Sequence, residues 1–320
     1  MLAFQRILCP TDLSLESDEA LRYAVALAEA YDAKLFLLHC SETSGNGHGT
    51  QAAEESAQIN RLFTASLAPY LGLAAFSHSN WEGLVLRGVN NVGQAIVAEA
   101  AKQQIDLIVM RSRRRPRAAL LLGSTAETVS RSAPCPVLVT HPREREWVGL
   151  STGEIDLHRI LIAHDFSRDS ELALNYGISL AQEYQAEVHV LHVLNTAGQG
   201  EPELAWSSSS GGSAYTFVAQ RLQQAIPKEV CLWCNFVNVV RSGKVYEEVL
   251  TYAKEREIDL ICMGASGSDW SLDKFFGSNV DRVLRQAPCP IFVARSTKEA
   301  RMSQPLSTKG GNGSELTEVL

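Results

Sequence analysis

Ile258-Asp-Leu-Ile-Cys-Met263 runs into Gly264-Ala-Ser-Gly267 and, nine residues later, into Gly277-Ser278. The apolar run predicts a buried strand, and Asn279–Gln286 predicts a helix. A backbone can approach an anion closely where Cβ is absent, and the start of a helix presents unpaired N–H groups at its positive end. This strand, glycine loop and helix therefore predict a unit that binds phosphate.

The chain is a tandem duplication, because four segments recur in the same order at a nearly constant offset. We expect a first domain over 1–145 and a second over 154–297. The Ser- and Gly-containing insertion 196–213 is expected to be flexible, and 298–320 to be a disordered tail. The recurring segments begin at Arg6 and Arg159, Ala33 and Ala186, Ile105 and Ile258, and Ala133 and Ala287.

Strands and helices alternate in each half, which indicates a five-stranded parallel sheet with helices on both faces. Ligands of such α/β sheets bind beyond the carboxyl ends of the strands. In the first half we predict strands at Arg6–Pro10, Lys34–His39, Ala74–Trp81, Ile105–Met110 and Val137–Thr140, and helices at Leu15–Tyr31 (with Ser14 as its N-cap), Gln51–Leu71, Val92–Gln103 and Gly123–Ser132.

Composition narrows the class of protein. The 320 residues are 45% hydrophobic and 20% charged, with a formal net charge of −7, so we expect neither a membrane nor nucleic acid as a partner. No apolar run approaches the roughly 18 residues that span a bilayer, and Met1–Arg6 is too short and mixed for a signal peptide. Seven cysteines without close-set pairing favour a reducing cytoplasm.

The motifs together resemble the universal stress protein family, in its tandem two-domain type. The resemblance rests on Gly264-x2-Gly267-x9-Gly277-Ser278, on Asp165 after the first strand of the second half, and on Ala-Pro-Cys-Pro before the fifth strand of each half. It covers the chain to about Ser296. The resemblance implies two flavodoxin-like or adenine-nucleotide alpha-hydrolase-like domains. It also implies ATP binding where the glycine motif is intact.

That resemblance implies a nucleotide site in the second domain, with ATP bound together with Mg²⁺ or Mn²⁺. A cation is expected because Lys274 is the single positively charged residue of this loop, which leaves most of the phosphate charge without a partner. Two alternatives stay open: the glycines could simply form a tight loop, and Asp165 could be a turn residue before Ser167. No catalytic residue and no protein ligand for a metal is predicted. The implied binding residues are Ala163 and Val193 at the base, Asp165 beside the adenosine, and Gly264, Gly267, Gly277, Ser278 and Asn279 at the phosphates.

The first domain departs from this pattern at Arg111-Ser-Arg-Arg-Arg-Pro-Arg117, where Arg111 and Arg114 replace the first two glycines. Asp12 and Gly123-Ser124 are retained. Long side chains there should obstruct the wrapping of backbone around a triphosphate. We favour a solvated surface loop over an anion or nucleic-acid contact.

Other reactive side chains are interpreted as structural. Cys231-Leu-Trp-Cys234 has CxxC spacing, but it lies in an apolar run predicted to be the third strand, where positions three apart face opposite sides. His39 and His192 are equivalent in the repeat, which favours a shared structural role. Cys135 and Cys289 are each expected to be structural.

The leading hypothesis is a cytoplasmic stress-response protein that binds ATP in its second domain and acts as a nucleotide-responsive regulator or scaffold. One alternative is a slow ATPase or phosphoryl-transfer protein, although no general base is evident near the loop. Another is an interaction protein without bound nucleotide. The fifth strands resemble the family's dimerising edge strand, so the halves could form an internal pseudo-dimer, or two chains a homodimer.

Overall fold

The structure is a computed structural model, which describes residues 4–41, 49–70, 80–112, 123–141, 145–149, 153–195, 214–227, 229–266 and 277–295. The expected insertion 196–213 and tail 298–320 lie outside the described residues. So do Gly267, Lys274 and residues 113–117 of the arginine loop.

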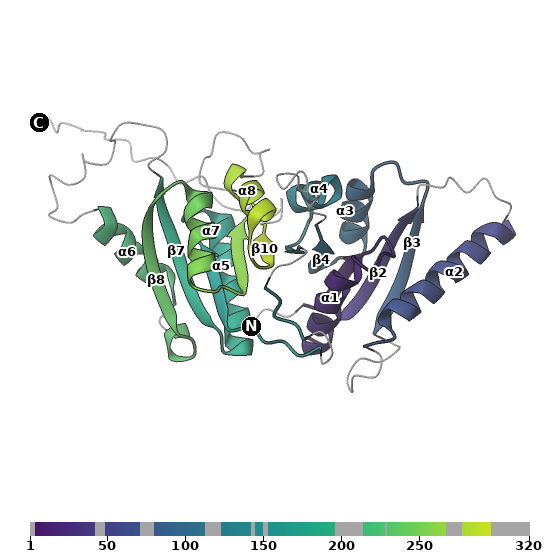
Figure 1. The fold of residues 1–320 in the computed structure, drawn as a ribbon, viewed down its shortest axis with the longest axis horizontal. Helices are drawn as coiled ribbons and strands as arrows, with labels where there is room; N and C mark the ends of the chain where they lie inside the picture. Colours follow the sequence, from purple (N-terminus) through teal and green to yellow (C-terminus); the bar gives the residue numbers. More distant parts are fainter. Residues whose placement is uncertain are drawn as a thin grey trace, which may run out of the picture.

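The helices and strands alternate as predicted (Figure 1). The first half contains β1 (Arg6–Pro10), α1 (Asp18–Ala30), β2 (Lys34–Ser41), α2 (Gly49–Leu67), β3 (Trp81–Arg87), α3 (Val92–Lys102), β4 (Leu107–Arg111), α4 (Ser124–Ser132) and β5 (Val137–Thr140). The second contains β6 (Arg159–Ala163), α5 (Arg168–Tyr184), β7 (Glu187–Asn195), α6 (Ala214–Ala225), the 3-10 turn η2 (Val230–Leu232), β8 (Phe236–Gly243), α7 (Val245–Glu255), β9 (Leu260–Gly264), α8 (Ser278–Gln286) and β10 (Ile291–Ala294).

The strands form one sheet in the order β3-β2-β1-β4-β5-β10-β9-β6-β7-β8. Pairing is parallel within each half, which confirms the predicted fold class. The halves meet where β5 and β10 pair antiparallel, with Leu138 opposite Phe292. The two domains therefore form an internal pseudo-dimer through their fifth strands.

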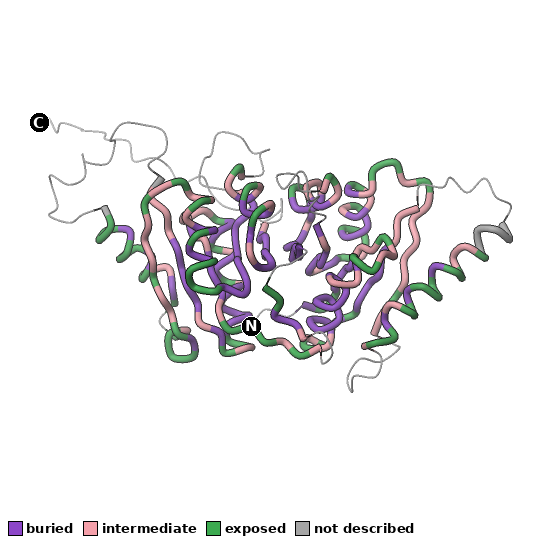
Figure 2. The backbone as a smooth tube through the Cα atoms, viewed as in Figure 1, coloured by how far each residue is buried: buried purple, intermediate pink, exposed green. Residues whose placement is uncertain are grey.

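Two apolar cores cover the two faces of this sheet, and each extends across both halves. Buried residues accordingly run through the strands of both halves (Figure 2). One core lies under α1, α2, α5 and α6, and the other under α3, α4, α7 and α8. At the junction, the ring of Tyr176 lies 5.0 Å from that of Phe292 and 6.0 Å from that of Phe4. Burial of shared apolar surface thus holds the domains together.

The observed third strands begin at Trp81 and Phe236. Most of the predicted strand Ala74–Trp81 lies outside the described residues, and β3 itself is Trp81–Arg87. The prediction for the second half is wrong, because the Cys231–Cys234 segment surrounds a 3-10 turn and β8 begins after it. Both are outer strands of the sheet, and their residues are mostly half-buried, so they lack the near-continuous apolar pattern of the inner strands. The more apolar segment before β8 misled the prediction.

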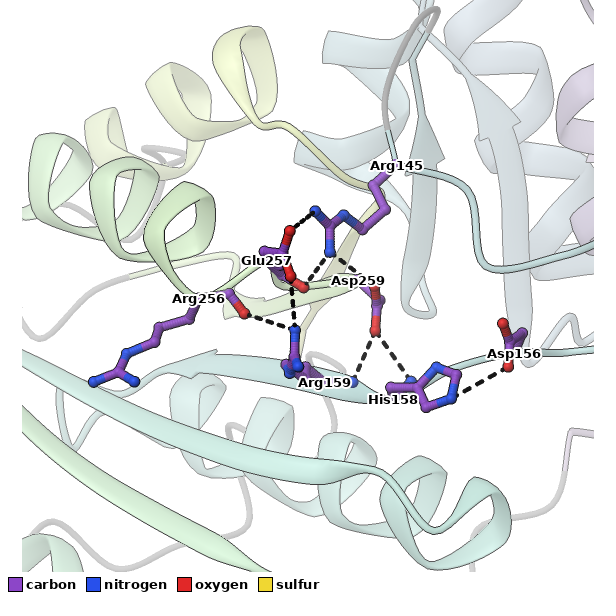
Figure 3. A network of polar contacts seen from close by, with 7 residues as sticks. All are labelled: Arg145, Asp156, His158, Arg159, Arg256, Glu257 and Asp259. Carbon is purple, nitrogen blue, oxygen red and sulfur yellow. Dashed lines mark hydrogen bonds and ion pairs between the residues drawn. The ribbon is translucent and has the colours of Figure 1, made fainter.

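The linker between the halves is tied to both of them. Asp259 accepts hydrogen bonds from the backbone N–H groups of His158 and Arg159, at 3.1 and 2.9 Å, and Arg145 of the linker pairs with Glu257 (Figure 3). On the other side, buried Trp147 packs edge-to-face on Tyr23 of α1, with ring centres 4.8 Å apart. Asp106 makes the equivalent backbone bonds in the first half, to Gln5 and Arg6.

Candidate functional site

The predicted site residues of the second domain gather at one end of the sheet. Ala163 ends β6 and pairs with Met263 of β9, while Val193 lies near the end of the neighbouring β7. Both are half-buried, and both pack against the core under α7 and α8. They therefore form apolar surface at the carboxyl ends of parallel strands, where α/β sheets bind ligands.

Helix α8 begins at the same end of the sheet. Gly277 is its N-cap, and the Gly277 N–H donates to the Ala265 carbonyl oxygen at 3.1 Å. Ser278 and Asn279 open the first turn with exposed and half-buried side chains, respectively. Gly277 has no side chain that could cap this helix. Its first N–H groups, together with the Ser278 hydroxyl, can donate to an anion.

Asp165 lies just beyond β6 and forms a turn. Its Oδ1 accepts the Ser167 N–H at 3.0 Å, and the following Phe166 has φ +61°. Asp12 does the same in the first domain, accepting the Ser14 N–H at 3.1 Å. Asp165 therefore has the role of a turn residue, and it is half-buried just beyond the carboxyl end of β6.

Gly264, the first glycine of the motif, is in close contact with another part of the protein. A Cβ placed there would lie 2.6 Å from both the Asp169 carbonyl carbon and the Ser170 nitrogen, in the first turn of α5. The same region is joined by a hydrogen bond from the Ser266 N–H to the buried Asp169 carboxylate, at 3.2 Å. The packing of α5 against β9 is thus enough to require glycine at this position.

The first domain has a different structure at the equivalent contact between strand end and helix start. Helix α1 begins at Asp18, so Leu15–Ser17 lie outside it, whereas α5 begins directly after Ser167, the counterpart of Ser14. The expected N-cap at Ser14 is therefore wrong, while Ser167 does cap α5, with its Oγ 3.2 Å from the Ser170 N–H.

Arg111, at the position of Gly264, occupies the region next to that irregular segment. Its guanidinium donates to the Glu16 carbonyl oxygen and pairs with Glu19 at 2.8 Å, and its side chain is 9% exposed. The prediction of a solvated loop is therefore wrong for Arg111. The remaining arginines of that loop lie outside the described residues.

A cavity of about 720 Å³ lies in the first domain, at the position equivalent to the proposed nucleotide crevice. It is lined by apolar side chains such as Leu38 and Ile96, and by Asp12, Arg111 and the Gly123–Ser124 start of α4. Sequence reasoning did not expect an open crevice beside Arg111. The retained Asp12 and Gly123-Ser124 were the available signal for it.

The remaining candidate side chains have structural surroundings. Cys231 is exposed and Cys234 is buried, around the 3-10 turn η2 instead of in a strand. The equivalent His39 and His192 make equivalent bonds from Nδ1, to the carbonyl oxygens of Thr11 and His164. Among the described residues, no group of three or more His, Cys, Asp or Glu side chains is placed to hold a metal ion.

Burial also shifts the pKa values of thiol and imidazole groups in these structural sites. It raises the pKa of Cys135 to about 12, which keeps that thiol protonated and unreactive. It lowers the pKa of His164 to about 4, with Asp165 acting in the opposite direction. Within the part of the chain that the structure describes, no helix has the length and apolar character needed to cross a membrane.

Known proteins match both halves. The model of the universal stress protein family matches residues 3–141 and again residues 157–295. Universal stress protein YxiE of Bacillus subtilis is 27% identical over 152 residues, which are 43% of this chain and 99% of that protein. A solved universal stress protein from Archaeoglobus fulgidus covers 91% of this chain and 98% of its own at 19% identity, with a TM-score of 0.61, and so shares the fold.

A solved universal stress protein in complex with cAMP also matches, at 23% identity over 44% of this chain and 98% of its own, with a TM-score of 0.32. The two family matches together span most of the sequence, and they coincide with the two halves of the ten-stranded sheet. This chain therefore belongs to the universal stress protein family and carries two of its domains in tandem.

Proposed function

We propose that the second domain binds ATP with Mg²⁺ or Mn²⁺, and that the bound nucleotide regulates contacts with partner proteins in a cytoplasmic stress response. The observation that carries this proposal is the start of α8, which opens beside the carboxyl ends of β6 and β9 with an N-cap glycine that has no capping side chain. Anions bind at such helix starts.

The surroundings of α8 suit the parts of a nucleotide. Ala163 and Val193 offer apolar surface for a base, and the Asp165 carboxylate can accept hydrogen bonds from ribose hydroxyls. The N–H groups at Ser278 and Asn279 and the Ser278 hydroxyl would bind phosphate oxygens. Gly267 is proposed to complete the phosphate loop, although it lies outside the described residues.

Gly264 is weaker evidence for phosphate binding than the sequence motif suggests, because the packing of α5 already explains its lack of a side chain. Its backbone remains part of the proposed phosphate loop. The proposed cation would be held mainly by phosphate oxygens, since the described residues form no ready cluster of ligands. The cation would offset the negative charge of the phosphates that the protein does not neutralise.

Regulation would follow from linkage between nucleotide binding and the shape of the crevice. A ligand that binds one conformation stabilises it, and at 100-fold excess over Kd it adds about 2.7 kcal/mol. Because the two domains share one sheet and two cores, such stabilisation can reach surfaces on both halves.

Ser278→Asp tests the site without disturbing the fold. An acidic residue in the first helical turn stabilises the helix but repels phosphate. We expect calorimetry to show MgATP binding by the unmodified protein and binding weaker by about tenfold or more in this variant. Ser124→Asp places the same charge at the equivalent first residue of α4 and should bind as the unmodified protein does.

Two results would contradict the proposal. One is the absence of MgATP binding by the unmodified protein, with no adenine nucleotide released from the purified protein in mass spectrometry. The other is equal affinity of the Ser278→Asp and Ser124→Asp variants. Melting temperatures without nucleotide should show that both variants are folded.

A further inference from the structure

Helices α4 and α8 meet across the junction between the domains, at the same end of the sheet as the proposed site (Figure 1). Arg285, in the last turn of α8, holds the Asp281 carboxylate with two bonds of 2.7 and 2.9 Å. The same guanidinium lies 3.8 Å from Glu127 Oε2, on α4 of the other domain. One arginine thus contacts carboxylates of both domains.

The position of Asp281 gives this contact a consequence for the nucleotide. Asp281 lies in the first turn of α8, and its N–H donates to the carbonyl oxygen of the N-cap Gly277. Its negative charge therefore lies on the first turn of the helix at whose start phosphate is proposed to bind, and it disfavours phosphate there. Arg285 offsets that charge from a side chain that is 14% exposed, where screening by solvent is incomplete.

Glu127 draws the same guanidinium toward the first domain. It lies in the first turn of α4, lines the first-domain cavity, and is also paired with Arg131 at 3.0 Å. A second contact reaches α4 from Arg295, directly after β10, which donates to the Ser130 carbonyl oxygen at 3.4 Å. A change in charge at Glu127 therefore alters how fully Arg285 neutralises Asp281.

We propose that Arg285 sets the phosphate affinity of the second domain by neutralising Asp281, and that Glu127 couples the first-domain crevice to this affinity by competing for Arg285. The proposal rests on ATP binding in the second domain. Arg285 acts through Asp281, so it is a positioning and screening residue. It makes the affinity of one domain depend on a side chain that lines the cavity of the other.

Titrations with MgATP at low ionic strength test the proposal. Arg285→Gln exposes the charge of Asp281 and should weaken MgATP binding by about threefold. Glu127→Gln removes the carboxylate that competes with Asp281 for Arg285, and should tighten MgATP binding by about twofold. The double variant Arg285→Gln with Asp281→Asn removes both charges and should return the affinity to near that of the unmodified protein. These differences should shrink at about 0.5 M salt.

Matched controls are available on outer strands of the first domain. Lys34 and Glu82 form an exposed pair between β2 and β3, so Lys34→Gln and Glu82→Gln repeat the charge changes far from α8 and should leave the affinity unchanged. If Arg285→Gln folds poorly, Arg285→Lys provides a second variant, which keeps the charge and should retain most of the affinity.

The outcomes separate the two proposals. If the unmodified protein does not bind MgATP, the proposed function fails and this inference fails with it. If it binds, but Arg285→Gln has the same affinity, the inference alone is overturned. Failure of Asp281→Asn to restore the affinity of Arg285→Gln would also overturn it, because a purely structural role of Arg285 gives that result.

Discussion

Arg111 and Gly264 end equivalent strands of the two domains, and the helices that face them begin at different residues. Helix α5 starts directly after Ser167, and its first turn approaches so closely that a Cβ at Gly264 would lie 2.6 Å from backbone atoms. Helix α1 starts later, at Asp18, and Arg111 bonds to the irregular segment before it. The residue at the strand end therefore matches the helix start, before any ligand is considered.

This comparison changes how the glycine motif is understood. Comparing the two sequences suggests that the first domain lost a phosphate loop. The structure adds that the domains differ in the length of a helix, and that a cavity of about 720 Å³ persists beside Arg111. Packing therefore explains the glycine at position 264, and the proposal of phosphate binding rests on the start of α8. Because α4 starts in the same way, the difference between the domains lies in Arg111 and Gly264.

Gly264→Ala should have the largest effect on this comparison. The added methyl group would meet the backbone of Asp169 and Ser170, which can move only if α5 shifts. We expect the free energy of unfolding of the second domain to fall by at least about 3 kcal/mol, in the absence of nucleotide. Denaturant titrations of the purified protein measure this.

Gly177→Ala on α5 is the matched control. Its Cβ would also be close to a neighbour, at 2.8 Å, but that neighbour is the terminal Cδ1 of the Ile162 side chain, which can rotate. The helix also gains from the exchange of glycine for alanine. A loss for Gly264→Ala no greater than that for Gly177→Ala would show that α5 does not require the glycine.

Acid should destabilise the second domain through His164, which stands where the first domain has Thr11. The Phe166 N–H donates to its Nδ1 at 3.2 Å, and its Nε2 has no hydrogen-bond partner among the described residues. Burial lowers the pKa of His164 from an ordinary 6.5 to about 4; Asp165 favours the charged imidazole, whereas His192 and Arg221 disfavour it.

The sign follows from linkage, because the unfolded chain binds the proton more readily. The contribution of neutral His164 to the free energy of unfolding is fully present above about pH 6.5. It is lost as the pH falls toward 4, which lowers the free energy of unfolding by roughly 2 to 3 kcal/mol. His192 and His189, whose pKa values are also lowered by burial, act in the same direction.

His164→Thr provides the control, since Thr11 Oγ1 accepts the equivalent Leu13 N–H at 3.0 Å. We expect this variant to lose distinctly less stability between pH 6.5 and 4 in denaturant titrations. Identical pH profiles for the two proteins would show that His164 is not the group responsible.

The inner part of the fold could be predicted from the sequence, and the outer strands could not. Inner strands such as β1 and β4 are buried on both faces, so their apolar runs are continuous and stand out. In β3, Gly83 is required because Phe63 of α2 lies 2.7 Å from the position of its Cβ. That requirement depends on a distant helix, so local pattern could not reveal it.

The candidate site was predictable in position, but less so in its causes. The strand pattern and the family resemblance placed Ala163, Val193 and the start of α8 at one end of the sheet, as the structure has them. The contact of Gly264 with α5 and the contact of Arg285 with Glu127 join residues far apart in sequence. Spacing within a motif carries no information on such contacts.

Arg111→Ala should have the smallest effect, because it removes interactions without forcing atoms together. The side chain loses its bond to the Glu16 carbonyl oxygen and its ion pair with Glu19, and Glu19 itself stays hydrated at 39% exposure. We expect a loss of about 1 to 2 kcal/mol in the free energy of unfolding. Lys34→Ala, which breaks an exposed ion pair, should change it by less than about 0.5 kcal/mol. Equal effects of the two substitutions in denaturant titrations would mean that Arg111 is only a surface side chain, and that α1 begins late for another reason.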